Sequence, residues 1–381
     1  MKVGTFFSGI GSPEQALLNL GINHEIEFAC DIDKYARETY LKNFDCKNMY
    51  QDITALDMKD LSYVDLLVFG FPCQAFSMAG KRGGFEDTRG TLFYDALRYL
   101  KEHKPRYFIA ENVKGLLSHD NGKTFQTIID CLALTTNTQM SLMPFDNLGY
   151  HIYYKVLNTK DFGIPQNRER IFIVGIRDDA DNNFRFPKEI PLKLKLKNIL
   201  QDNPNYAKSG LFQPYPRNYK ELGLERIEQL EIRKDNVSNT ITTSNDQVIK
   251  VDDKYYLSDK ASDKIKLHNN KSNKKASIFQ NKQYIKTHSL YPRSGNPKKG
   301  GTGHLSKTDG TSYCIDTGNA QAIEKNNKIR RLTPIECERL QGFPDNHTEG
   351  VSDTQRYKQC GNSITVNVME SILKNLLNGH S

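Results

Sequence analysis

The amino-acid sequence predicts an α/β protein in which a doubly wound sheet is joined to a second, smaller, irregular β-rich module. Short apolar runs alternate with amphipathic stretches over residues 1–175, and this regularity returns after residue 328. The intervening residues 181–328 are instead rich in Lys, Asn, Ser, Gly and Pro. The 381 residues leave room for two domains, since one domain usually takes roughly 100–200 residues.

Five apolar runs are predicted to form the strands of the sheet: Val3–Phe7, Glu27–Cys30, Leu66–Phe71, Tyr107–Ala110 and Ile171–Ile176. Four stretches with helical periodicity lie between these runs: Pro13–Leu20, Lys34–Asn43, Leu92–Lys101 and Phe125–Leu134. Continuous apolar strands separated by helices are typical of a parallel sheet that is covered on both faces. We therefore expect a doubly wound α/β domain.

The middle of the chain predicts short strands among loops. Val248–Val251 and Tyr255–Leu257 have β-like composition, whereas His268–Ser277 and Pro292–Gly303 have the composition of loops. We expect the second domain to span residues 191–344.

Two helices are predicted near the end of the sequence. Leu332–Glu338 contains a threonine followed by a proline, the residue types preferred at an N-cap and at the first helical position. Ser363–Leu377 has apolar residues at helical spacing. We expect residues 345–381 to complete the first domain, which otherwise spans residues 1–190.

The positive charge of the chain is concentrated in the middle segment. The formal net charge is +8, but residues 191–328 contain 25 Lys and Arg against 14 Asp and Glu, so the remainder carries −3. Such a distribution favours a module that binds a polyanion. A lysine-rich solvated surface explains the charge alone equally well.

Several classes of protein are disfavoured by the composition. The seven cysteines are odd in number and include no C-x-x-C pair, which argues against a disulfide framework and a structural zinc site. No two histidines have metal-ligand spacing, so we expect no metal. The sequence has neither an apolar run near the ~20 residues that span a bilayer nor a secretory signal, and we expect an intracellular, cytoplasmic protein.

A glycine-containing turn follows the first predicted strand. In Phe6–Ser12, the glycines let the backbone approach a ligand at a helix N-terminus. Asp31 ends the second strand about twenty residues later, where an acidic residue commonly binds ribose hydroxyls. Without the full G-x-G-x-x-G pattern, this combination fits any cofactor that contains a nucleoside.

The segment Gly70–Ser77 is the strongest candidate for a reactive site. Its cysteine, Cys73, follows a strand whose end should lie at the carboxyl edge of the sheet, where ligands bind in α/β proteins. Pro72 fixes the turn before it. The following residues 80–90 combine glycines with basic side chains, which suits a loop that closes over a nucleic acid.

Two other strand ends add polar groups to the same edge. Glu111 follows one strand and supplies a carboxyl group, and Gln166–Arg170 precedes another and supplies Arg168 and Arg170. A cysteine, a carboxyl group and two guanidinium groups form a nucleophile, an acid and donors to an anion or carbonyl. Helix capping by Glu111 and surface ion pairs of the arginines are the structural alternatives.

The order of these segments resembles bacterial and phage C5-cytosine DNA methyltransferases of the restriction-modification type. The matching segments are Phe6–Ser12, the Pro-Cys motif in Gly70–Ser77, Glu111–Val113, Gln166–Arg170, Arg331–Pro334 with Arg339–Pro344, and Gly361–Ser363. They cover residues 1–177 and 328–378, and the intervening residues lie where the family has its variable target-recognition region. Ser12 and Asp31 depart from the glycine and the glutamate usual in the family.

The resemblance implies a Rossmann-like methyltransferase domain with S-adenosylmethionine as the methyl donor. Its cofactor-binding positions correspond to Phe6, Ser8, Gly9, Ile10, Gly11, Asp31, Ile32, Asp52, Ile53, Pro72, Leu92, Asn362 and Ser363. Asp52 is equally explained as an ordinary turn residue.

The resemblance also implies a mechanism and a substrate. Cys73 would attack C6 of a flipped-out cytosine, protonated Glu111 would act at N3, and Arg170 would hold O2. Arg168 would contact a phosphate or orient the site. We expect a monomer that acts on a specific duplex sequence, with a restriction endonuclease in the same host as a functional but not bound partner.

Three other functions remain to be separated from this one. A cytosine-C5 methyltransferase acting on RNA, such as tRNA, would share the motifs, although the long middle segment favours DNA. A catalytically silent DNA-binding protein is disfavoured by the intact Cys73, Glu111 and arginine set. A nicotinamide-dependent oxidoreductase would leave the Pro-Cys and Gln-x-Arg-x-Arg segments unexplained.

Overall fold

The structure is a computed structural model of the chain. The described residues are 1–72, 92–136, 139–140, 148–181, 183–201, 285–289, 305–317, 321–325 and 328–378. Cys73 lies outside them, as do the predicted strands Val248–Val251 and Tyr255–Leu257 and the predicted loops His268–Ser277 and Pro292–Gly303.

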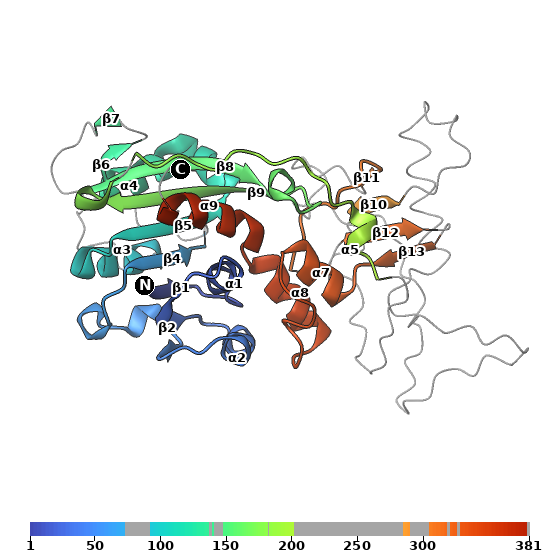
Figure 1. Cartoon of the computed structure of the whole chain (residues 1–381), viewed down its shortest axis with the longest axis horizontal. Helices are drawn as coiled ribbons and strands as arrows, with labels where there is room; N and C mark the ends of the chain where they lie inside the picture. Colours follow the sequence, from blue (N-terminus) through green and yellow to red (C-terminus); the bar gives the residue numbers. More distant parts are fainter. Residues whose placement is uncertain are drawn as a thin grey trace, which may run out of the picture.

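A large mixed sheet forms the body of the protein (Figure 1). In the described part of the chain it has nine strands in the order β3-β2-β1-β4-β5-β9-β8-β6-β7. Their bounds are β1 Lys2–Phe6, β2 Glu25–Cys30, β3 Met49–Tyr50, β4 Leu66–Gly70, β5 Tyr107–Val113, β6 Ala133–Thr136, β7 Gln139–Met140, β8 Tyr150–Asn158 and β9 Glu169–Arg177.

The first four α-helices alternate with strands along the chain, whereas the last three follow one another near its end. The α-helices are α1 Ser12–Asn19, α2 Lys34–Asn43, α3 Leu92–His103, α4 Lys123–Leu132, α5 Leu196–Ile199, α7 Pro334–Leu340, α8 Asp353–Asn362 and α9 Val366–Asn378. Short 3₁₀ helices are η1 Ile53–Ala55, η2 Met58–Asp60, η4 Lys114–Gly122, η5 Thr159–Phe162 and η6 Asp178–Ala180.

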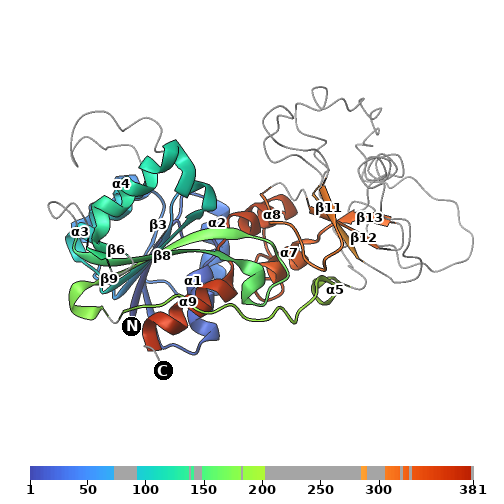
Figure 2. The same ribbon diagram turned by 90° about the horizontal axis from the view of Figure 1, so that it is seen from above.

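Helices cover both faces of the sheet (Figure 2). On one face, α3 and α4 pack on apolar side chains of β1, β4 and β5 such as Phe6, Leu67 and Phe108. On the other face, α1 and α9 pack on the alternate side chains, including Val3 and Val68. The continuous apolar runs in the sequence therefore reflect strands that are buried on both sides.

β9 differs from the expected parallel arrangement. It runs antiparallel to both of its neighbours, and Tyr107 of β5 lies opposite Ile176. The physical reason is the short connection from β8, which contains the 3₁₀ helix η5 and a turn but no α-helix. Parallel neighbours need a crossover of about a dozen residues or more. β8 was not predicted from the sequence, because polar residues interrupt its apolar side chains.

The topology gathers several loops at one edge of the sheet. β3, β2 and β1 extend the sheet in one direction while β4 and β5 extend it in the other, so the chain order reverses between β1 and β4. These five strands are parallel. Ligands of α/β proteins bind beyond the carboxyl ends of the strands at such a reversal. The residues after β1, β2, β4 and β5 all reach this edge.

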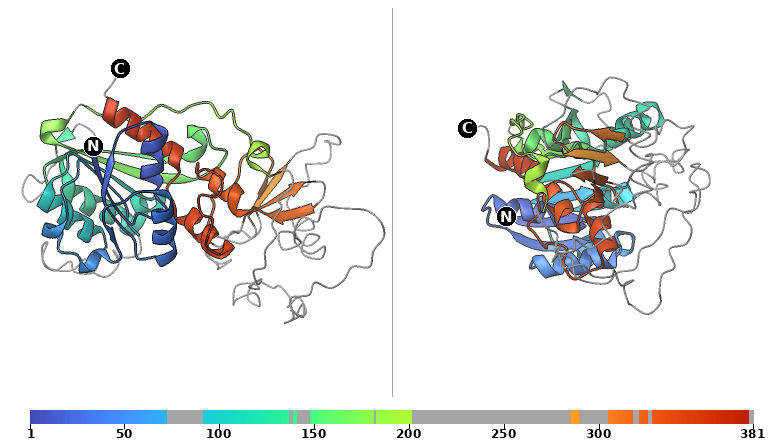
Figure 3. Two further views of the ribbon diagram at one scale, coloured as in Figure 1. Left: turned by 60° about the horizontal axis from the view of Figure 1, so that its bottom comes forward. Right: turned by 90° about the vertical axis from the view of Figure 1, so that its right-hand side faces the viewer.

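A second sheet lies beside α5 and α7, apart from the main sheet (Figures 1 and 3). Its order among the described residues is β11-β10-β12-β13, all antiparallel. The bounds are β10 Lys286–Ser289, β11 Leu305–Lys307, β12 Gln321–Lys325 and β13 Lys328–Arg331. Ile323 of β12 shares an apolar cluster with Leu340 of α7 and Ile199 of α5.

The C-terminal helices follow the predicted signals with one change. Thr333 caps α7, and its side chain and that of Glu336 form a reciprocal capping box. The predicted helix Ser363–Leu377 begins later, at Val366, because Ser363 has an extended backbone at the end of α8. No described helix is both long and apolar enough to cross a membrane.

Gly175 gives a test of sheet packing. A Cβ at this position of β9 would overlap the ring of Phe108 on the paired strand β5. We expect Gly175→Ala to lower the free energy of unfolding by about 1–3 kcal/mol, measured by urea denaturation. Gly115→Ala is the control, since its Cβ would make only an ordinary contact, 4.0 Å from Val113. Equal stability of the two variants would contradict this packing.

Candidate active site

The turn after β1 is held by backbone hydrogen bonds in a conformation that favours glycine. Phe7, Gly9 and Gly11 have φ angles of 54°, 55° and 82°. The Ser8 N–H donates to the Cys30 carbonyl at 3.0 Å, and the Gly11 N–H donates to the Ser8 carbonyl at 3.0 Å. Since left-handed backbone is costly for residues with a side chain, the glycines make this turn possible.

Asp31, at the end of β2, joins this turn to α2. Its carboxylate accepts hydrogen bonds from the Gly9 N–H at 2.8 Å and from the Asp33 N–H at 2.8 Å. Burial raises the pKa of Asp31, although these two backbone donors act in the opposite direction. Arg37 donates to the main-chain carbonyls of Asp31 at 2.7 Å and Ile32 at 3.0 Å.

Three features of these residues fit a bound nucleoside cofactor. The hydroxyl oxygen of Ser8 is buried without a hydrogen-bond partner among the described residues. No described atom lies within 4 Å of a Cβ built at Gly9, so the turn faces open space there. Ile32 is 67% exposed, which leaves an apolar side chain beside the turn for a flat ring.

The other predicted cofactor positions differ in their exposure and local structure. Asp52 accepts from the Thr54 N–H and hydroxyl and so caps η1, the role of an ordinary turn residue. Ile53 is buried below it, whereas Pro72 is exposed. Asn362 is exposed and Ser363 buried at the end of α8, and Leu92 begins α3.

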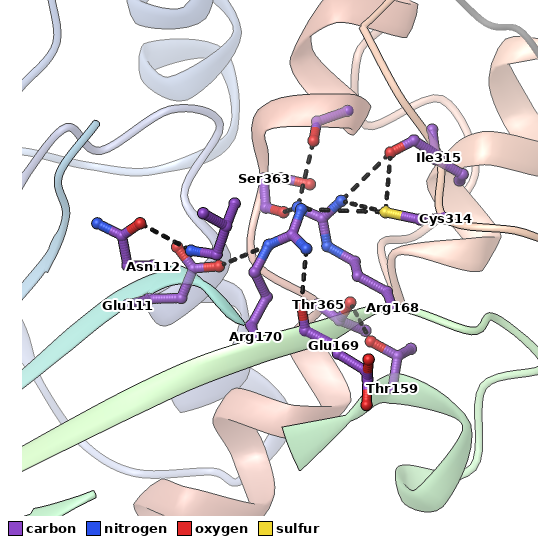
Figure 4. Close-up of polar contacts among 12 residues, drawn as sticks. Glu111, Asn112, Thr159, Arg168, Glu169, Arg170, Cys314, Ile315, Ser363 and Thr365 are labelled. Carbon is purple, nitrogen blue, oxygen red and sulfur yellow. Dashed lines mark hydrogen bonds and ion pairs between the residues drawn. The ribbon is translucent and has the colours of Figure 1, made fainter. Parts of the chain in front are cut away.

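Glu111 and Arg170 meet across the strand pair β5 and β9 (Figure 4). Arg170 Nε lies 3.1 Å from Glu111 Oε1, and the two side chains are 19% and 12% exposed. Burial raises the pKa of Glu111 above its usual value, against the opposing attraction of Arg170 and Arg168. A carboxyl group with a raised pKa keeps its proton nearer to neutral pH, as a general acid requires.

Glu111 also lies next to the segment that leads to Cys73. Gly70 pairs with Glu111 in the sheet, and a Cβ at Gly70 would lie 3.4 Å from Glu111 Oε2. The Asn112 side-chain amide donates to the Phe71 carbonyl at 2.8 Å. Asn112 therefore fixes the backbone two residues before Cys73, which itself lies outside the described residues.

Arg168 is buried and binds main-chain carbonyls from two distant segments. Its Nη2 donates to the Ser363 carbonyl at 2.8 Å and to the Gly361 carbonyl at 3.2 Å. Its Nη1 donates to the Ile315 carbonyl at 3.3 Å and to the Cys314 sulfur at 3.3 Å. Of the two predicted roles, this geometry favours orientation of the site over contact with a phosphate.

Sequence reasoning missed Cys314 and the function of Gln166. The Cys314 sulfur lies near both guanidinium groups, since it also accepts from Arg170 Nη2 at 3.9 Å. The Gln166 side chain accepts from the Ile315 N–H at 3.0 Å and donates to the Leu340 carbonyl at 2.6 Å. No local sequence signal could reveal these contacts, because their partners are more than 140 residues apart.

Comparison with known proteins identifies the family. The model of the C-5 cytosine-specific DNA methylase family matches residues 1–378. The chain belongs to this family. It is 33% identical to the orphan methyltransferase M.SPRI of Bacillus phage SPR, over 99% of this chain and 97% of that protein. It is 34% identical to the type II methyltransferase M.HhaI of Haemophilus parahaemolyticus, over 97% and 92%.

Solved structures share the fold. A mutant DNMT2 of Spodoptera frugiperda superposes with a TM-score of 0.62 at 19% identity, covering 98% of this chain and 99% of the other. A putative DNA modification methyltransferase from an E. coli prophage gives a TM-score of 0.56 at 20% identity, covering 99% of both chains. The predicted fold class, with a smaller second β module, is therefore confirmed.

Membership of the family defines the reaction class. The protein is a DNA (cytosine-5-)-methyltransferase, as the sequence predicted, and its family uses S-adenosylmethionine as the methyl donor and DNA as the substrate. The glycine turn, Asp31 and Glu111 are thus features of a methyltransferase, and the oxidoreductase interpretation is excluded.

The salt dependence of DNA binding separates the two predicted roles of Arg168. We expect Arg168→Lys to destabilise the protein, because one ammonium group cannot replace a fork that binds four acceptors. The slope of the logarithm of the DNA association constant against the logarithm of the salt concentration should not change. A slope reduced by about 1 would instead indicate a lost phosphate contact. Arg177→Lys, at a surface pair with Asp179, is the control for stability.

Proposed function

We propose that the enzyme methylates C5 of a flipped-out cytosine through a covalent bond between Cys73 and C6. The observation that carries this proposal is the partly buried pair of Glu111 and Arg170 beside Gly70, three residues before Cys73. Three residues span at most about 10 Å of extended chain, so the thiol is within reach of the same base. Addition of a thiolate at C6 makes C5 nucleophilic enough to accept a methyl group.

Glu111 and Arg170 would act on the polar edge of the cytosine. Addition of the thiolate pushes negative charge into the ring, and a proton held by Glu111 relieves this charge at N3. Arg170 would donate to O2. The raised pKa of Glu111 supports this assignment, because a carboxyl group that keeps its proton can donate a hydrogen bond to N3. Loss of the C5 proton then releases Cys73, with water as the proposed base.

We propose that the turn after β1 holds S-adenosylmethionine. Ser8, Gly9, Ile10 and Gly11 would bind its methionine part, and Asp31 its ribose hydroxyls. The remaining positions around the edge are Phe6, Ile32, Asp52, Ile53, Pro72, Leu92, Asn362 and Ser363. When bound, the cofactor supplies an electrophilic methyl group on a sulfonium. Asp31 supports this role because its carboxylate already orders the Gly9 N–H.

Residues 191–344 are proposed as the target-recognition domain, with residues 1–190 and 345–381 as the catalytic domain. The target atom is inaccessible inside a duplex, so the base must leave the helix at a cost of a few kcal/mol. The basic excess in residues 191–328 would offset part of this cost through phosphate contacts. Base contacts in the major groove would give sequence specificity.

The biological setting is a proposal based on the relatives. They include type II methyltransferases such as M.HpaII of Haemophilus parainfluenzae and the orphan methyltransferase of phage SPR. We propose a cytoplasmic monomer that modifies DNA and protects it where a cognate endonuclease is present. The RNA alternative is disfavoured because the family model that matches residues 1–378 is that of C-5 cytosine-specific DNA methylases.

Replacement of the nucleophile tests the covalent mechanism. We expect Cys73→Ser to reduce transfer of tritiated methyl groups from S-adenosylmethionine to duplex DNA by at least about 1000-fold. Cys131→Ser should retain activity, since this half-buried cysteine of α4 is outside the site. Duplexes with 5-fluorocytosine should trap the wild type covalently, because fluorine cannot leave as a proton does. Near-normal transfer by Cys73→Ser would exclude the mechanism.

The pH profile tests Glu111 as the acid. Its protonated form is retained below the raised pKa and lost as the pH rises through it, so we expect the single-turnover rate to fall at high pH. Glu111→Gln should lower the rate by about 10²–10⁴-fold and remove this high-pH decline, because an amide does not titrate. If the rate of Glu111→Gln still fell at high pH as in the wild type, the decline would have to come from another titrating group.

A further inference from the structure

We infer that His347, in the loop between α7 and α8, is a positioning residue for the cofactor turn. Its ring Nε2 lies 2.8 Å from the main-chain carbonyl oxygen of Ile10, in the turn between β1 and α1. The inference rests on the proposed cofactor site at this turn. His347 itself is only 3% exposed and serves as a support beneath the turn.

The hydrogen bond defines the state of the imidazole. A carbonyl oxygen can only accept, so Nε2 must carry the hydrogen. Burial lowers the pKa of His347, which favours the neutral ring with its hydrogen on Nε2.

Aromatic neighbours and one side-chain amide hold His347 in place. The Phe343 ring stacks on the imidazole with centroids 4.3 Å apart and an interplanar angle of 27°. The centroid of the Phe44 ring lies 5.8 Å from that of the imidazole, with an interplanar angle of 55°. The Asn43 side chain donates to the main-chain carbonyl of His347 at 2.9 Å. With the ring fixed in this way, the direction of the Nε2–H is fixed as well.

This contact locks one peptide group of the cofactor turn. The peptide between Ile10 and Gly11 has its carbonyl bound to His347 and its N–H bound to the Ser8 carbonyl. A flip of this peptide would break both bonds. Such a flip is otherwise easy beside a glycine, because glycine adopts positive and negative φ with similar ease. His347 therefore keeps the turn in one conformation before the cofactor binds.

The expected benefit is cofactor affinity. When the turn already has the conformation that binds the cofactor, no binding free energy is spent on ordering the turn. Without the His347 bond, only part of the population would have the competent turn, and the apparent dissociation constant would rise in proportion. Within the described part of the chain, Glu111 and Arg170, the groups proposed to bind the cytosine, form no hydrogen bond or ion pair with His347, so DNA affinity should be unaffected.

Two substitutions at His347 separate its hydrogen bond from its packing. The phenyl ring in His347→Phe can still stack on Phe343 but has no hydrogen-bond donor for the Ile10 carbonyl. Gln in His347→Gln offers an amide N–H at a reach similar to that of Nε2. By calorimetry, we expect the first to raise the Kd of S-adenosylmethionine and S-adenosylhomocysteine about 10-fold, equivalent to about 1.4 kcal/mol. The second should raise it less than about threefold, and both should keep the KM for DNA.

Two further variants make the outcome decisive. Asn43→Ala weakens docking of the same loop without touching the Ile10 carbonyl, and should change the Kd by less than about twofold. Asp31→Ala reports on the cofactor site itself. Unchanged affinity in His347→Phe would overturn this inference but not the proposed cofactor site. Equal losses of affinity in His347→Phe, His347→Gln and Asn43→Ala would do the same. Unchanged affinity in Asp31→Ala would overturn the proposed cofactor site and this inference with it.

Discussion

The candidate active site depends on one buried guanidinium group, that of Arg168. It binds the carbonyls of Ile315, Gly361 and Ser363, which belong to the segment between β11 and β12 and to the end of α8. A buried charge is costly unless its donors find acceptors. Both Nη atoms are bonded to these segments, while Nε has no partner among the described residues, so the segments must close around the guanidinium group for the fold to be stable. Since Arg170 follows two residues later on β9, this closure also determines where Arg170 meets Glu111.

The charges around Glu111 balance two opposing requirements. Without a nearby cation, a carboxyl group at this position would be neutral and would lack an ion pair to orient it. A carboxylate that is fully paired with cations would instead be a poor acid. Arg170 is in direct contact, while Arg168 is turned away toward backbone carbonyls, so Glu111 has one close cation. Burial then outweighs the attraction, and the pKa rises.

The sequence predicted groups near strand ends and missed those that depend on tertiary closure. Glu111, Asp31 and Arg170 were singled out because each lies next to an apolar run of the sequence that was predicted to form a strand. The antiparallel direction of β9 was not, because apolar runs carry no direction. Cys314 and His347 were not either, since each gains its neighbours from segments far away in the chain.

The loop and helix between α7 and α9 connect the two ends of the site. At one end, His347 holds the Ile10 carbonyl in the proposed cofactor turn, and at the other end Gly361 and Ser363 hold Arg168. Between them, Gln359 in α8 donates to the Tyr35 carbonyl at the start of α2. One continuous stretch of backbone thus contacts both the proposed cofactor turn and Arg168, two residues before the proposed base-binding Arg170, and a shift at either end would be felt at the other.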